Sequence, residues 1–163
     1  MQIVLSKNFK LISVKPDSKI FLIRFIILLL LASWIAGFLL PLIISIENPF
    51  INYFLKRFYS TVCHQESFKC ISIGHAGMLV CARCTGIYFG AFITSISSLF
   101  IVVPFISKKL LMISILPLMM DVFLTTSGVY TYSQFLSFVT GIIFGMVIYL
   151  FTILELEKFI LNK

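Results

Sequence analysis

The sequence contains few charged residues for its length. Only 12% of its 163 residues are charged and six are acidic, whereas a soluble domain carries about 25% charged residues. Hydrophobic residues make up 60% of the chain, Phe alone occurs 18 times, and the mean hydropathy is +1.10. So little charge excludes an ordinary water-soluble domain. We therefore expect residues 1–163 to form a single domain integral to a membrane, with the lipid bilayer as its first partner.

The apolar segments lack the regular polar–apolar alternation that a transmembrane barrel requires. They form runs of about 20 residues, the length of a membrane-spanning helix. The expected spans are residues 25–46, 85–106, 110–127 and 134–154. These runs predict an all-α integral membrane fold with four transmembrane helices.

Basic residues are unevenly distributed between the two sides that these four spans define. Three lie on one side, namely Lys56, Arg57 and Lys69. The other side carries Lys7, Lys10, Lys15, Lys19, Arg24, Lys108, Lys109, Lys158 and Lys163. The positive-inside rule then predicts a multi-pass protein of the cell membrane with residues 1–24 and both termini in the cytoplasm. The net charge of +7 is explained by topology, so no nucleic-acid partner is expected.

The long connection between the first two spans, residues 50–84, is expected outside the membrane. Its first part, residues 50–62, has an amphipathic pattern, which predicts a helix lying flat at the outer interface. The apolar face of that helix comprises Ile51, Phe54, Leu55, Phe58 and Val62.

Two short segments recur in the second half of the chain. TGIYFG at 85–90 recurs as TGIIFG at 140–145, and LPLIIS at 40–45 recurs as LPLMMD at 116–121. The pattern predicts two duplicated helical hairpins, the first with a larger loop, unless the similarity is chance in apolar sequence. Each TG segment also contains G-x-x-x-G, which allows close helix packing. We expect the second and fourth spans to pack centrally, or these faces to bind a second copy or a membrane-protein partner.

All four cysteines lie between positions 63 and 84, outside the expected spans. Cys81-x-x-Cys84 has the spacing of a metal knuckle, and Cys63 with His64 offers the second half of a zinc site. Adjacent side chains tend to diverge, so His64 could instead orient a ligand from outside the coordination sphere. In that case Cys70, His75 or water would be the fourth ligand.

These residues also carry a family resemblance. Cys63-His64-Gln65 followed by CARCTGIY at 81–88 resembles an uncharacterised family of small prokaryotic membrane proteins, a domain of unknown function. The resemblance covers roughly residues 50 to 147 and implies a multi-helix membrane protein with a metal site at Cys63, His64, Cys81 and Cys84. Members often have serine where this chain has Cys70, which argues against Cys70 as an essential ligand.

Asp121 is the one acidic residue expected inside a span. A charge at mid-membrane is costly, so it should face protein or water, and Arg83 is the natural partner. The pair could simply lock the fold, or Asp121 could act as a general base or substrate anchor beneath the metal. Gln65 could add an amide donor there, or be an exposed loop residue. Asp121, Arg83 and Gln65 are therefore the candidate catalytic residues.

Three functions remain open at this point. Zinc could be structural and shape an outer surface for a partner or lipid, which complete thiolate-rich ligation favours. Zinc could instead serve an enzyme acting on a lipid-borne or extracytoplasmic substrate. In the third, Cys81 and Cys84 form a redox pair exchanging with Cys63 and Cys70, as in a thiol-disulfide oxidoreductase. The spacing favours metal binding, with a non-catalytic role preferred.

Overall fold

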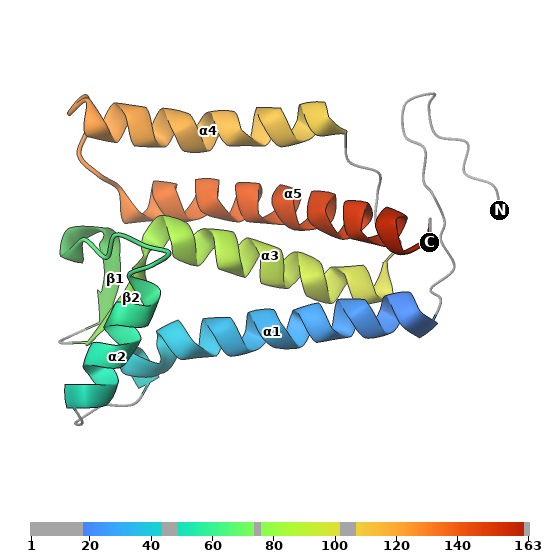
Figure 1. Ribbon diagram of the computed structural model, residues 1–163. Helices are drawn as coiled ribbons and strands as arrows, with labels where there is room; N and C mark the ends of the chain where they lie inside the picture. Colours follow the sequence, from blue (N-terminus) through green and yellow to red (C-terminus); the bar gives the residue numbers. More distant parts are fainter. Residues whose placement is uncertain (1–17, 44–48, 74–75, 102–106, 162–163) are drawn as a thin grey trace.

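A computed structural model describes residues 18–43, 49–73, 76–101 and 107–161. Four long helices lie side by side in the order α4, α5, α3, α1, and α3 and α5 run opposite to α1 and α4 (Figure 1). A small sheet and the crosswise helix α2 cover one end of this bundle. The elements are α1 (Ser18–Ile43), α2 (Pro49–Tyr59), the 3₁₀ turn η1 (Ser67–Lys69), β1 (Cys70–Ile73), β2 (Ala76–Cys81), α3 (Ala82–Phe100), α4 (Lys108–Thr126) and α5 (Gln134–Leu161).

Within the part of the chain that the structure describes, three helices are long and apolar enough to cross a membrane: Ser18–Leu42, Lys108–Thr126 and Gln134–Ile160. They correspond to the expected first, third and fourth spans. Helix α3 has 19 residues, but it buries small and hydroxyl side chains, among them Thr85, Gly90 and Ser95. Its low apolar content follows from its central place in the bundle. The expected span 85–106 begins at Ala82, and residues 102–106 lie outside the described residues.

Helices α3 and α5 form the expected central pair. A Cβ atom on any of their four G-x-x-x-G glycines would collide with a backbone carbonyl of the other helix. The four approaches are Gly86 to Phe138, Gly90 to Ile142, Gly141 to Arg83 and Gly145 to Ile87. They are reciprocal, since the residues met in α5 are the repeat equivalents of those met in α3. A duplicated hairpin would produce this pattern.

The glycine faces are therefore occupied within one chain. Because each glycine already contacts the partner helix backbone, these faces are not available to a second copy or a membrane-protein partner. The structure thus gives no support to the expectation of oligomerisation through G-x-x-x-G.

The expectation of a purely α fold is wrong in one segment. Strands β1 and β2 pair antiparallel, with Cys70 opposite Cys81 and Ser72 opposite Gly77. Leu79 and Val80 of β2 are buried in a hydrophobic cluster with residues of α1 and the end of α2. The strands are only four and six residues long, and their pairing depends on this contact with α1, which local sequence does not reveal.

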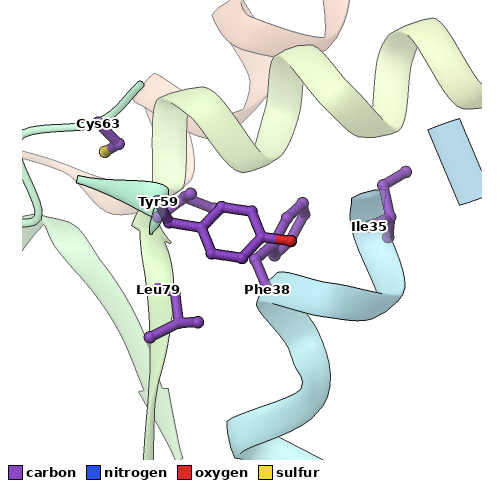
Figure 2. Close-up of a cluster of buried hydrophobic side chains, with 6 residues drawn as sticks. Ile35, Phe38, Tyr59, Cys63 and Leu79 are labelled. Atoms are coloured by element: carbon purple, nitrogen blue, oxygen red, sulfur yellow. The ribbon is translucent and has the colours of Figure 1, made fainter. Parts of the chain in front are cut away.

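Helix α2 is the expected amphipathic helix, ending at Tyr59 rather than at residue 62. Tyr59 lies against Phe38 of α1 and Leu79 of β2 (Figure 2), and its hydroxyl donates to the carbonyl of Trp34 at 3.0 Å. On its other side, Phe50 and Phe54 are exposed. An exposed aromatic face beside a bundle of membrane helices fits a position at the lipid interface.

Candidate metal centre

Three of the four cysteines come together at the end of the bundle that α2 covers. Cys63 follows α2, Cys81 ends β2 and Cys84 lies in the first turn of α3. Their sulfur atoms all lie within 4.8 Å of one another, and Cys63 is buried. A tetrahedral zinc ion with Zn–S bonds of about 2.3 Å needs thiolates at such separations.

Gln65 fixes the loop that carries Cys63. It is the one non-glycine residue with positive φ (50°) in the described part of the chain, and it turns the backbone after Cys63. Its side-chain amide donates to the carbonyls of Lys56 at 3.1 Å and Leu79 at 2.8 Å. Both amide hydrogens are engaged, so Gln65 ties α2 to β2 rather than presenting a donor to a ligand.

The surroundings of the cysteines separate Cys63 from Cys70. Hydrogen bonds from the thiols of Cys81 and Cys84 lower the pKa of Cys63, and the backbone N–H of Cys81 donates to its sulfur at 3.2 Å. Burial raises the pKa of Cys70 to about 11. The hydrogen bond with Cys63 raises the pKa of Cys81 as well, so Cys63 would be the first thiolate of the group and a metal ion would have to displace the proton of Cys81. Cys70 is separated from the group by its position rather than by its pKa.

The remaining predicted ligands are placed differently. His64 is exposed and does not belong to the three-thiol group. Cys70 is buried opposite Cys81 in the sheet, and also stands outside the group. His75 lies outside the described residues. Among those residues, no further Cys, His, Asp or Glu completes the group.

Arg83 and Asp121 form the expected ion pair at this same end. Arg83 Nη2 lies 2.5 Å from Asp121 Oδ2, and Asp121 is 4% exposed. Ser137 of α5 donates to Oδ2 at 2.8 Å, and the Tyr130 hydroxyl donates to Oδ1. One buried carboxylate therefore joins α3, α4, α5 and the α4–α5 loop.

Comparison with known proteins shows the family. A sequence profile described as predicted membrane protein (DUF2085) matches residues 63–151, more than half of the chain. The chain belongs to this family. An uncharacterised protein of Methanocaldococcus jannaschii is 32% identical over 108 residues, which cover 61% of this chain and 66% of that protein. No solved structure matches the chain.

The DUF2085 match includes all three clustered cysteines and the Arg83–Asp121 pair, whereas α1 and α2 precede it. The residues that line a cavity of about 390 Å³ beside Arg83 also fall within the match. The polar lining of this cavity comprises Lys69, Arg83, Thr125, Thr126, Tyr130, Thr131 and Tyr132. Lys69, Tyr130 and Ser137 belong to this region although no sequence pattern assigned them to it. The hydroxyl-rich loop between the last two helices was the only available signal.

Proposed function

We propose that this family member is a multi-pass membrane protein with a zinc site formed by Cys63, Cys81 and Cys84. The proximity of three thiols from three separate segments carries the proposal. A bound ion would join the end of α2 to β2 and α3. His64 is adjacent to Cys63 but lies outside the three-thiol group, so it would have to turn toward the ion to be the proposed fourth ligand, and water is the alternative.

A structural role is the better supported use of this zinc. Cys63, Cys81 and Cys84 belong to or pack against a buried cluster that includes Phe38 and Tyr59, so metal binding would stabilise the packing of the segments around them. Three thiolates also donate much charge to the ion, which makes it a weak Lewis acid. The resulting outer surface, including the exposed face of α2, would contact lipid or a partner.

Two alternatives each have one observation in their favour. A zinc-dependent enzyme is favoured by the three-thiol group, which leaves a fourth position for water. The cavity beside Arg83 would then hold the substrate. Thiol–disulfide exchange is favoured by Cys70, which lies directly opposite Cys81 in the sheet. Asp121 and Arg83 would be catalytic only in the first alternative.

The proposed topology has four spans: the three helices named above and α3, which is the second span in chain order. The cysteines then lie outside the cytoplasm. Reporter fusions at Phe68, after Ser107 and at the C-terminus test this topology. We expect an external signal at Phe68 and cytoplasmic signals at the other two positions, as the basic residues predict. A cytoplasmic signal at Phe68 would contradict both the orientation and the redox alternative.

The deciding experiment measures metal content and free thiols on protein purified in mild detergent without reductant. We expect about one zinc per chain and no disulfide, as one tetrahedral site predicts. Removal of the ion by a chelator should then expose the loop after α2 to protease, because the ion joins that loop to β2 and α3. Metal-free protein with disulfide bonds would favour thiol exchange instead. A metal-loaded protein whose loop stays protected after chelation would favour the enzyme.

A further inference from the structure

The cavity beside Arg83 has the properties of a small-molecule site. Its volume of about 390 Å³ lies within the range of ligand pockets, about 300–1,000 Å³. It is bounded by η1, the first turn of α3, the end of α4 and the α4–α5 loop. These segments meet at the end of the bundle that also holds the cysteines (Figure 1).

The charged side chains that line the cavity are all cationic. Lys69 and Arg83 contribute positive charge, and no acidic residue is among the described residues of the lining. Thr125 and Tyr130 already donate their hydroxyl hydrogens to Asp121, whereas the hydroxyl of Tyr132 has no hydrogen-bond partner among the described residues. Lys69, Arg83 and Tyr132 are therefore the donors that this lining offers, and they suit a ligand with acceptor oxygens.

Arg83 has a donor without a partner. Its Nη2 holds Asp121, whereas its Nε is buried and makes no hydrogen bond to the residues that the structure describes. A guanidinium can only donate, and a buried N–H without an acceptor is costly. The Arg83 side chain is 20% exposed, so it can meet a ligand oxygen in the cavity while Nη2 keeps its pair with Asp121, and Nε would gain an acceptor only if the atoms that cover it move.

Lys69 can supply a second positive contact. Its ammonium pairs with Glu66 at 2.5 Å, but both side chains are about one-third exposed, at 33% and 37%. Exposed pairs of this kind contribute little, so Lys69 can turn toward a bound anion at small cost.

We propose that this cavity binds a phosphate ester. A guanidinium and an ammonium together are a common pair for phosphate, and the Tyr132 hydroxyl would donate to a further oxygen. The volume leaves room for a small alcohol on the phosphate. Tyr130 and Tyr132 fit the headgroup level of a membrane, so the source is either a lipid headgroup or a soluble phosphate ester.

The test uses the full chain in mild detergent, with one arm for each source. The lipid arm compares binding of phosphatidylglycerol with that of diacylglycerol by native mass spectrometry. The soluble arm compares glycerol phosphate with glycerol by calorimetry. The variants are Lys69→Gln, Arg83→Lys and Tyr132→Phe, and Lys56→Gln is the matched control because Lys56 is exposed and belongs to the helix that covers this end.

We expect the phosphate-bearing compound to bind in at least one arm, which identifies the source. Lys69→Gln and Arg83→Lys should each weaken binding about tenfold, and Tyr132→Phe less, while Lys56→Gln changes it by about twofold or less. Failure of both phosphate compounds to exceed their phosphate-free partners overturns the proposal. Equal weakening by Lys56→Gln and Lys69→Gln also overturns it, because only surface charge would then matter. If Arg83→Lys reduces zinc content, the Lys69 and Tyr132 variants decide.

Discussion

The two ends of the helical bundle are built around the same interaction. At the cysteine end, Arg83 of α3 pairs with Asp121 of α4. At the opposite end, Arg24 of α1 pairs with Glu157 of α5, with a nitrogen–oxygen distance of 2.6 Å and exposed side-chain fractions of 12% and 6%. Arg24 also donates to the backbone carbonyl of Ser98 in α3. Each pair therefore links three helices or their ends.

The ends differ in what surrounds the pair. At the opposite end, the helices are joined by the Arg24–Glu157 ion pair and by a neutral contact between the hydroxyls of Ser98 and Tyr149. The cysteine end adds three clustered thiols, a cavity and hydroxyl donors to the carboxylate. Since an ion pair between helices is present at both ends, a structural role is sufficient to explain the Arg83–Asp121 pair. Specific function is better sought in the three-thiol group, which among the described residues is found at the cysteine end alone.

Removal of a clustered cysteine should have the largest effect on stability, because it removes the feature that distinguishes the cysteine end. Cys81→Ser or Cys84→Ser should remove the bound metal and lower the thermal stability in detergent strongly, because metal-binding energy becomes folding energy. Metal analysis and thermal unfolding measure the two effects.

Cys70→Ser is the matched control, since Cys70 is buried nearby but stands outside the three-thiol group. It should leave metal content and stability largely unchanged. Equal losses from Cys70→Ser, Cys81→Ser and Cys84→Ser would show that Cys70 is a ligand.

The second prediction breaks each ion pair in turn. Asp121→Asn and Glu157→Gln should each reduce the free energy of unfolding by about 3 kcal/mol, the low end of the range for buried pairs, because each leaves unpaired an arginine whose side chain is only partly buried. Denaturant titration in mixed micelles measures this loss. The double variant Arg83→Gln with Asp121→Asn should recover much of it. A stable, zinc-loaded Asp121→Asn protein that fails to replace the wild type in cells would instead make Asp121 a functional residue.

Sequence alone predicted the parts of the site that depend on local spacing or on the cost of burial. Cys81 and Cys84 are separated by one helical turn, and a buried Asp121 requires a cation, so Arg83 could be inferred. Arg24 was interpreted only as a topological charge, whereas it forms a buried ion pair. That pairing depends on how α1 approaches α5, which no local pattern encodes. The β1–β2 hairpin and the cavity were missed for the same reason, because both depend on contacts between distant segments.

The third prediction tests the glycine contacts that connect the two ends. Gly90→Ala and Gly145→Ala each place a Cβ atom against a carbonyl of the facing helix, and overpacking of this kind costs about 1–3 kcal/mol. The two losses should be similar, because the contacts are reciprocal. Gly77→Ala is the control, since nothing lies within 4 Å of its added Cβ. Very unequal losses in the same unfolding assay would argue against the duplicated hairpin.

The smallest expected losses of stability come from removing one tyrosine hydroxyl at each end. Tyr130→Phe removes a hydrogen bond to the charged Asp121, and such bonds contribute about 1.5–3 kcal/mol. The lower value is expected here because Tyr130 is only partly buried. Tyr149→Phe removes the 3.2 Å contact with the Ser98 hydroxyl, which still donates to the carbonyl of Ser95 at 2.8 Å.

Tyr149→Phe leaves no charge unsatisfied, so it should cost about 0.5 kcal/mol, as a neutral hydrogen bond does at the low end of its range. Unfolding of both variants in the same micelles measures the difference, and zinc content should be unchanged in each. A larger loss for Tyr149→Phe would mean that the contact between Ser98 and Tyr149 contributes more to stability than the hydrogen bond between Tyr130 and Asp121.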